Sequence, residues 1–155
     1  MKYIETKIRV RYNEVDRMNV IHNSRYFIYQ EEGKFNFLDY YNLNKVICDE
    51  NDIYSPVTKN YMEYIKPATV RDILTVKVSV YKVSQVEVKY VSGIFNDKNE
   101  LMAFGFVSNC FSDKSLNPIA IKKIDEETFN KFKSLEVKDE LGEINKKNII
   151  NFFND

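Results

Sequence analysis

The segment from Ser24 to Tyr41 constrains the fold most, because its apolar residues extend around most of the circumference of a helix. One stripe, with spacings of three and four, contains Tyr26, Tyr29, Gly33, Phe37 and Tyr41, and the residues that widen it are Phe27, Phe35 and Leu38. A helix of this kind is covered by protein rather than laid on a surface. Glycine costs about 1 kcal/mol in a helix interior relative to alanine, so Gly33 predicts that this helix closely approaches a sheet.

The chain on both sides of this helix has the pattern of antiparallel strands. From Ile4 to Tyr12, β-favouring residues occupy even positions and charged residues occupy odd positions, which predicts a strand with one buried face. Further strands are predicted at Val57–Tyr64, Ile73–Val83, Val86–Tyr90 and Leu101–Phe111, joined by short connections. This order predicts an α+β hotdog fold, in which a curved antiparallel sheet wraps around one long helix.

The composition changes after Pro118. The segment Asp125–Asp155 is charged and rich in Asn and Lys, its apolar residues have helical spacing, and the pattern is interrupted near Gly142. We therefore expect a hotdog domain over residues 1–123 and a C-terminal helical tail of one or two helices over residues 124–155. The tail is expected to lie away from the chemistry and to dock on the outer face of the sheet or on a neighbouring subunit.

Charge and composition exclude several classes of function. The chain contains 23 Lys and Arg against 23 Asp and Glu, so it has no electrostatic reason to bind a nucleic acid backbone or an anionic membrane. His22 is the single histidine, and Cys48 and Cys110 are far apart, so we expect ordinary thiols and neither a metal centre nor a disulfide framework. The chain has no signal peptide and no run of ~20 apolar residues, which favours a cytoplasmic protein without a transmembrane segment.

The segment from Tyr12 to Tyr26 points to the chemistry. The first predicted strand ends here, Asp16 is an exposed carboxylate in the loop that follows, and Asn23 or Ser24 is a suitable N-cap for the helix. A carboxylate beside the free N–H groups of a helix N-terminus can activate a nucleophile while the amides stabilise the developing oxyanion. The arrangement predicts hydrolysis of an ester or a thioester.

Two motifs resemble those of a known family. The first reads Arg9-Val-Arg-Tyr12 and then Asp16-Arg-Met-Asn-Val-Ile-His22-Asn23-Ser-Arg-Tyr26, with Glu31-Glu32-Gly33 and Phe37-Leu38 following in the helix. The second reads Tyr64-x-x-Pro67-Ala68-x-x-x-Asp72-x-Leu74-x-Val76. Over residues 5–122 the chain resembles the 4-hydroxybenzoyl-CoA thioesterase-like branch of the hotdog acyl thioesterases.

The resemblance implies roles for the matching residues. Asp16 matches the catalytic carboxylate, and Asn23 matches the position whose backbone amide points at the thioester carbonyl. His22 lies one residue before the position at which one branch of the family has an assisting histidine, so it is a third candidate catalytic residue. Asn19 replaces the usual glycine of the loop, and asparagine tolerates the left-handed conformation better than other non-glycine residues.

Four further residues are candidates for binding the substrate. Tyr26 is expected to line the pocket or the core, and Glu31 to reach the pocket from the helix. Lys66 and Arg71 are expected to meet the phosphates of CoA at the pocket mouth. Members of the family form dimers or dimers of dimers with acyl pockets at the subunit boundary, so the resemblance implies a homodimer or a homotetramer.

The expected function is hydrolysis of an acyl-CoA or acyl-carrier-protein thioester, with no cofactor. Asp16 either takes a proton from water or attacks the thioester to form an anhydride, and the sequence leaves both routes open. The alternative is a non-enzymatic hotdog module that binds acyl-CoA or fatty acids. A dehydratase or hydratase agrees less well with the sequence, because the chain lacks a Gly-Asp-x-Asn-Pro-x-x-His segment.

Overall fold

The computed structural model describes residues 2–44 and 53–155, so Cys48 lies outside the described residues. The elements in chain order are β1 (Ile4–Arg9), the short 3-10 helix η1 (Tyr12–Glu14), α1 (Asn23–Tyr40), β2 (Val57–Tyr64), β3 (Ile73–Val83), β4 (Glu87–Phe95), β5 (Leu101–Cys110), α2 (Ile121–Ile124), α3 (Glu126–Ser134), α4 (Lys138–Leu141) and α5 (Lys146–Asn154). The long helix and every strand expected from the sequence are present.

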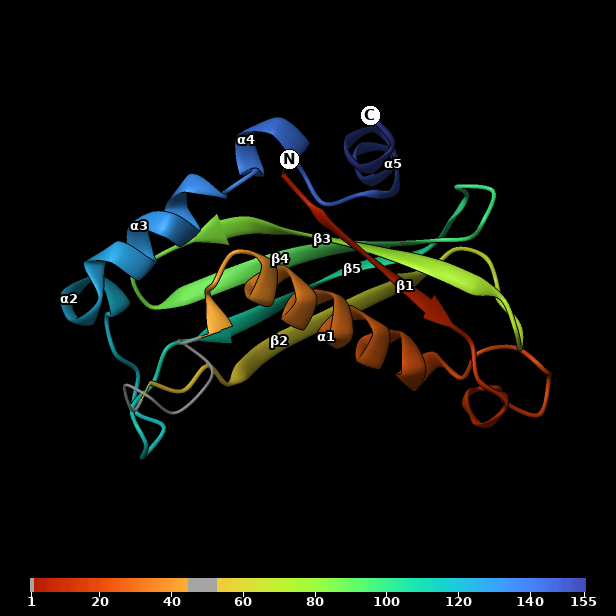
Figure 1. Ribbon diagram of the computed structural model, residues 1–155, viewed down its shortest axis with the longest axis horizontal. Coiled ribbons are helices and arrows are strands. Elements are labelled where there is room, and N and C mark those ends of the chain that lie inside the picture. Colours follow the sequence, from red (N-terminus) through yellow and green to blue (C-terminus); the bar gives the residue numbers. More distant parts are fainter. Residues whose placement is uncertain (1, 45–52) are drawn as a thin grey trace.

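The strands form one antiparallel sheet in the order β1-β3-β4-β5-β2, so β1 and β2 are its two edges. Helix α1 lies across one face of the sheet (Figure 1). Its buried residues Tyr29, Phe37 and Leu38 belong to the same apolar core as Val76 of β3 and Ile94 of β4. The hotdog fold expected from the order of the elements is confirmed.

Gly33 allows α1 to pack directly against β3. A Cβ atom at this position would lie 2.8 Å from Val76 Cγ1 and 2.8 Å from Val78 Cγ2, closer than two carbon atoms can approach. The close approach to the sheet that Gly33 predicts is therefore confirmed.

The side of α1 that faces away from the sheet is exposed within one chain. Ile28 is 49% exposed, Phe35 is 45% exposed and Tyr40 is 62% exposed. Because apolar residues surround most of the helix, we expected protein to cover most of its sides. A single chain does not cover this side. The sheet of one chain covers one side of α1 and leaves an apolar stripe on the other.

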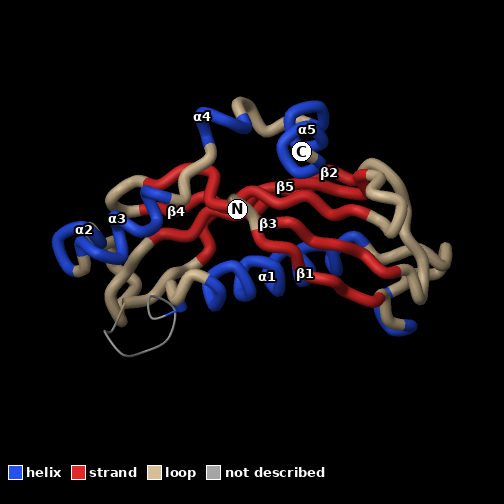
Figure 2. The backbone as a smooth tube through the Cα atoms, turned by 45° about the horizontal axis from the view of Figure 1, so that its top comes forward, coloured by secondary structure: helices blue, strands red, loops and turns tan. Residues whose placement is uncertain are grey.

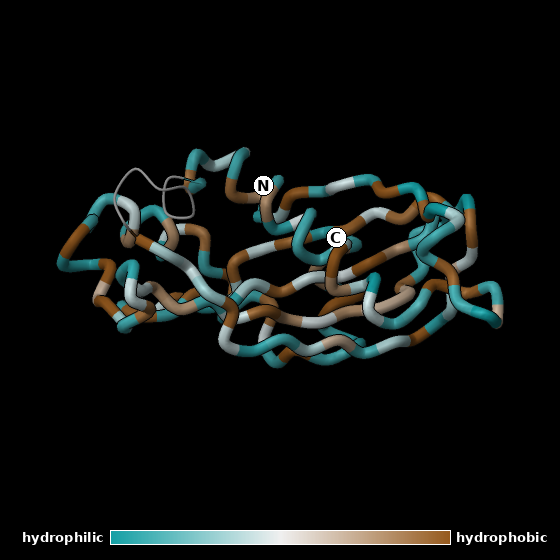
Figure 3. The backbone as a smooth tube through the Cα atoms, turned by 90° about the horizontal axis from the view of Figure 1, so that it is seen from below, coloured by the Kyte–Doolittle hydropathy of each residue, from teal (hydrophilic) through white to brown (hydrophobic). Residues whose placement is uncertain are grey.

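Helices α4 and α5 cover the face of the sheet opposite α1 (Figure 2). A second apolar core lies between them and the strands, and it contains Val91, Phe95, Leu101, Phe104, Val137, Leu141, Ile149 and Phe153. Apolar and polar residues follow one another along the strands in Figure 3, but β4 and β5 are buried along most of their length. The tail contains three helices, α3 to α5, rather than the expected one or two, and within one chain α4 and α5 dock on the outer face of the sheet.

The ends of two elements differ from the expectation. Strand β1 stops at Arg9 rather than Tyr12, because the Arg11 N–H donates to Glu14 Oε1 at 2.8 Å and the chain turns into η1. Helix α1 is capped by His22 rather than by Asn23 or Ser24.

Candidate active site

The loop between η1 and α1 forms a tight turn that carries Asp16, at the same end of the sheet as the first turn of α1 (Figure 1). Val15 and Ile21 form an antiparallel bridge. The Asp16 N–H donates to the Val20 carbonyl at 2.8 Å, and the Asn19 N–H donates to the Asp16 carbonyl at 3.0 Å. Asn19 has a φ of 61°, so it adopts the left-handed conformation expected of the residue that replaces glycine here.

The Asp16 carboxylate is half-buried and oriented by its own loop. Its Oδ1 accepts a hydrogen bond from the Met18 N–H at 2.8 Å. Within residues 2–44 and 53–155, its Oδ2 takes part in no hydrogen bond or ion pair. A carboxylate that is fixed through one oxygen and open at the other is suited to accept a proton or to attack a carbonyl carbon.

The first turn of α1 presents an unused backbone donor. His22 Nδ1 accepts a hydrogen bond from the Ser24 N–H at 3.2 Å and lies 2.8 Å from Ser24 Oγ, so this side chain caps the helix. Asn23 is the first helical residue, and no hydrogen bond among the described residues uses its N–H. The Tyr64 hydroxyl donates to the Asn23 carbonyl at 3.0 Å and holds this turn against the end of β2.

These groups line one hollow of about 460 Å³, which we call the Asp16 pocket. Its lining includes Asp16, His22, Asn23, Tyr26, Tyr64 and Lys66. The Tyr26 and Tyr64 rings meet edge to face, with their centroids 5.1 Å apart, and form one wall. Five of the seven predicted site residues are thus brought together, and Tyr64 is an addition whose only sequence signal is its place at the start of the second motif.

The two phenols of the pocket remain neutral at physiological pH. Burial raises the pKa of Tyr26, the nearby Tyr64 and Asp72 raise it further, and a hydrogen bond with the Ala68 backbone partly opposes them. Burial also raises the pKa of Tyr64. Both phenols therefore stay protonated, and the negative charge among the described lining residues is that of Asp16.

Two predicted binding residues lie outside the Asp16 pocket, and a third lies at its rim. The Lys66 ammonium pairs with Glu100 at 2.9 Å beside the pocket. Arg71 lines two neighbouring hollows instead. Glu31 lies on the outward side of α1, where it pairs with the buried Lys34 at 2.9 Å. The roles of Glu31 and Arg71 in binding substrate therefore stay predictions.

Glu14 stabilises the loop that carries Asp16, and the sequence analysis did not identify it. It is 8% exposed, and its backbone carbonyl accepts the His22 N–H at 2.9 Å while its side chain accepts the Arg11 N–H. Burial raises the pKa of the adjacent Tyr29, and the Glu14 carboxylate raises it further. The available signal was that Glu14 continues the even-numbered, buried positions of the first strand.

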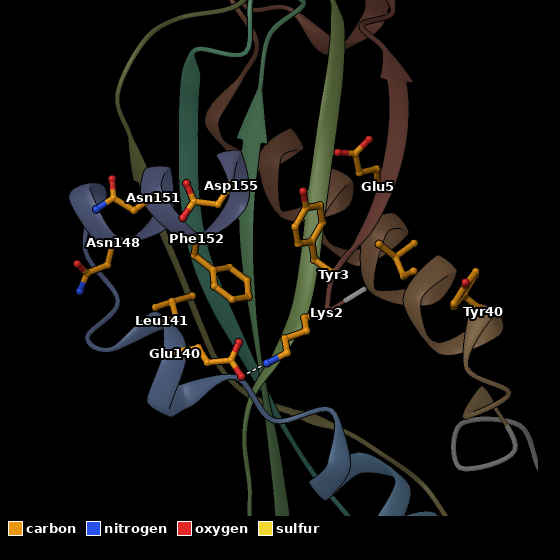
Figure 4. Close-up of a pocket in the computed structure, with 11 residues that line it drawn as sticks. Lys2, Tyr3, Glu5, Tyr40, Glu140, Leu141, Asn148, Asn151, Phe152 and Asp155 are labelled. Atoms are coloured by element: carbon orange, nitrogen blue, oxygen red, sulfur yellow. Dashed lines mark hydrogen bonds and ion pairs between the residues drawn. The ribbon is translucent and has the colours of Figure 1, made fainter.

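A hollow of about 890 Å³, larger than the Asp16 pocket, lies elsewhere (Figure 4). It is formed by the start of β1, by α4 and α5, and by Tyr40 at the far end of α1. Two of its carboxylates are already paired, Glu140 with Lys2 and Glu5 with Lys77. No helix N-terminus with a facing carboxylate appears among its described residues, so size alone does not make it the reactive site.

Two kinds of feature are absent from the described residues. Among residues 2–44 and 53–155, no group of three His, Cys, Asp or Glu side chains is placed to hold a metal ion. In the same part of the chain, no helix combines the length and apolar character required to cross a membrane.

Comparisons with known proteins agree with this fold. The sequence profile of the thioesterase-like superfamily matches residues 10–137. The chain is 23% identical over 124 residues to a putative acyl-CoA thioesterase, YneP, of Bacillus subtilis, and the match covers 79% of this chain and 90% of that protein.

Solved structures show the same arrangement. A DHNA-CoA thioesterase from Staphylococcus aureus superposes with a TM-score of 0.82 at 25% identity, covering 92% of this chain and 97% of that one. A 1,4-dihydroxy-2-naphthoyl-CoA thioesterase from Synechocystis superposes with a TM-score of 0.73 at 14% identity, covering 83% and 96% of the two chains. The second likeness is one of fold alone.

Proposed function

The chain belongs to the thioesterase-like superfamily, and from this premise we propose that it hydrolyses acyl-CoA thioesters in the Asp16 pocket. One observation carries the proposal: Asp16, which has one open oxygen, and Asn23, which has an unused N–H, line the same hollow. A general base and an oxyanion donor are the two groups that hydrolysis of a thioester requires.

In the proposed reaction, the thioester carbonyl oxygen accepts a hydrogen bond from the Asn23 N–H at the positive end of α1. Asp16 takes a proton from water while the water oxygen attacks the carbonyl carbon. The amide stabilises the negative charge that develops on the carbonyl oxygen. The carbon–sulfur bond then breaks, and the thiol leaves with the proton that Asp16 had accepted.

A second route uses the same residues. Asp16 attacks the carbonyl carbon, the thiolate leaves, and water hydrolyses the resulting anhydride. Turnover in water labelled with heavy oxygen, followed by mass spectrometry of the peptide containing Asp16, separates the routes. Label in the Asp16 carboxylate indicates the anhydride, whereas label that never enters Asp16 favours the general base.

Two observations support CoA rather than a carrier protein as the thiol part of the substrate. The Bacillus subtilis relative is named an acyl-CoA thioesterase, and the Staphylococcus aureus structure is named a thioesterase of a CoA ester. The Asp16 pocket is also lined by Lys66, whose exposed ammonium pairs with Glu100 and would exchange that surface partner for a phosphate of CoA. A panel of acyl-CoA and acyl-carrier-protein thioesters, scored by thiol release, tests the choice.

Asp16→Asn is the variant that tests the proposal. It keeps the size of the side chain and an oxygen for the Met18 N–H, but it removes the charge. Removing a positioned base lowers kcat/KM by about 10²–10⁴-fold. Asp139→Asn, which removes an exposed carboxylate from α4, is the matched control and should be unchanged. If Asp16→Asn turns over within a few-fold of the parent, the proposed mechanism is wrong and a binding module is the better description.

A further inference from the structure

A hollow of about 480 Å³ follows the free edge of β1, beside the loop that carries Asp16. The residues that give it its character are Lys7, Arg9, Arg11, Tyr12, Glu32 and Arg71. Four cations face one carboxylate among these described residues, in a chain whose net charge is zero. We call this hollow the basic groove. A cleft lined by one sign of charge concentrates ligands of the opposite sign.

Strand alternation and register bring these cations together. The even positions of β1 are buried, which leaves Lys7, Arg9 and Arg11 exposed along one side. The Arg71 N–H donates to the Val10 carbonyl at 3.0 Å, so the chain that enters β3 places Arg71 beside the end of β1. The cluster therefore joins residues that are sixty positions apart in the sequence.

The charges of the groove are not neutralised by the protein. No ion pair within the described residues involves Lys7, Arg9, Arg11 or Arg71. Arg71 also has a φ of 72°, an uncommon conformation for a residue with a side chain, and such residues cluster at ligand sites. Like charges held side by side repel one another, and an anionic ligand would relieve that repulsion.

A third hollow shares lining residues with both the groove and the Asp16 pocket. This hollow, of about 490 Å³, shares Arg71 with the basic groove and shares Lys66 and Pro67 with the Asp16 pocket. A ligand could therefore place its reactive group beside Asp16 and its anionic end in the basic groove. CoA has this design, because a long flexible pantetheine arm separates its thioester from a diphosphate and a 3′-phosphorylated nucleoside.

Tyr12 completes the match to a nucleotide. Tyr12 lines the groove and is 86% exposed, so packing in the core does not explain why an aromatic residue stands at this position. Exposed aromatic rings next to cations are the usual platforms on which a nucleobase stacks. A carrier protein presents the same phosphopantetheine arm but has no nucleobase for such a ring.

We propose that the basic groove binds the phosphorylated nucleotide end of CoA, with Arg9, Arg11 and Arg71 on the phosphates and Tyr12 on the adenine. The proposal rests on the proposed function and makes CoA, not a carrier protein, the thiol part of the substrate. Charge-assisted hydrogen bonds from arginine to phosphate supply the affinity.

The first test compares two substrates with the same acyl group, one an acyl-CoA and the other an acyl-pantetheine without the nucleotide. Arg9→Gln/Arg11→Gln should raise KM for acyl-CoA about 10- to 100-fold, since each lost contact involves a charged group. Its kcat/KM for acyl-pantetheine should stay within about twofold of the parent, because that substrate does not reach the groove. Lys131→Gln/Lys147→Gln removes two exposed charges elsewhere and should change neither value.

The second test measures binding without catalysis, by calorimetric titration with adenosine 3′,5′-bisphosphate. Arg9→Gln/Arg11→Gln and Tyr12→Ala should each weaken binding about tenfold or more. Glu32→Gln removes the carboxylate of the groove and should strengthen it. Thermal melts check that each variant is folded. If the double variant is not folded, the parent protein provides the test through the salt dependence of its KM. The KM should rise steeply with salt for acyl-CoA and stay flat for acyl-pantetheine.

The outcomes separate this inference from the proposed function. If the arginine variants hydrolyse acyl-CoA and bind the bisphosphate as the parent does, the groove assignment is wrong while the thioesterase proposal stands. If the variants lose activity toward an acyl-carrier protein only, the groove binds an acidic protein, and the inference is overturned. If the parent hydrolyses no thioester, the proposed function fails, and the bisphosphate titration still decides whether the groove binds a nucleotide.

Discussion

His22 and Asn23 are adjacent at the start of α1, but they offer different atoms to the site. The His22 ring caps the helix through the Ser24 N–H, which is a structural use of its Nδ1. Asn23 offers its backbone N–H, which no hydrogen bond among the described residues uses. At the scale of single residues, our proposal therefore assigns the oxyanion role to the main chain of Asn23 and gives His22 the role of holding that main chain in place.

This difference predicts the order of three variants. His22→Ala removes the cap and should destabilise the fold by about 1 kcal/mol, with a modest loss of kcat/KM. His22→Asn restores an N-cap acceptor and should recover both values. Asn23→Ala keeps the backbone N–H and should have the smallest effect. Chemical denaturation and steady-state kinetics measure the two quantities. A loss of kcat/KM in His22→Asn as large as that in Asp16→Asn would instead place the imidazole in the chemistry.

Individual residues show which parts of the site could be predicted from the sequence and which could not. Asp16 and Asn23 could be placed because both lie in one loop–helix segment, and local spacing fixes them relative to each other. Arg71 could not be placed, since its neighbours depend on how β1 pairs with the chain that enters β3. Glu14 was missed because its partners are the Arg11 backbone N–H and the Tyr29 side chain of α1. Neither partner is a charged residue that could be recognised in the sequence as a pair with Glu14.

At the scale of elements, periodicity predicted the strands and α1, but it could not assign the tail to a surface. The alternation in β1 points to one buried face, and that strand is indeed exposed on its other side. Strands β4 and β5 are buried almost throughout, with α1 on one face and α5 on the other. An apolar run such as Leu101–Phe106 signals cover on both faces, but it does not say which element supplies it.

The packing of α5 predicts a loss of stability without a loss of chemistry. Phe153 is fully buried against β4 and β5, so Phe153→Ala should cost about 3–5 kcal/mol of unfolding free energy. The control Ile124→Ala truncates a residue that is 55% exposed and should cost little. Thermal melts and kcat/KM below the melting range measure both effects. Truncation after Lys123 removes the whole tail and should likewise lower stability or alter assembly more than it affects the chemical step. A truncated protein that stays folded and dimeric but has no turnover would contradict the expectation that the tail lies away from the chemistry.

At the scale of the whole molecule, the two edges of the sheet differ in kind. The β1 edge carries the cations of the basic groove, which would repel the same edge of a second copy. The β2 edge instead exposes apolar side chains, with Val57 48% exposed and Tyr61 44% exposed. The charged residues within β2, Lys59 and Glu63, are of opposite sign, and an exposed edge strand without net charge is a template for pairing with another chain. The outward apolar stripe of α1 lies uncovered as well, and a second copy would cover it.

We therefore expect at least a dimer that pairs β2 with β2. Asn60 lies near the middle of β2 and is exposed, so in a two-fold antiparallel pair it would lie close to its own counterpart. Asn60→Lys would place two like charges there and weaken the pairing, whereas Asn130→Lys on exposed α3 is the matched control. Sedimentation velocity at micromolar concentration should show a dimer or larger for the parent and the control, and a shift toward monomer for Asn60→Lys.

Turnover should fall together with the population of dimer, because Tyr64 and Lys66, at and just after the end of β2, line the Asp16 pocket. A parent that sediments as a single monomeric species and retains full turnover would contradict this assembly.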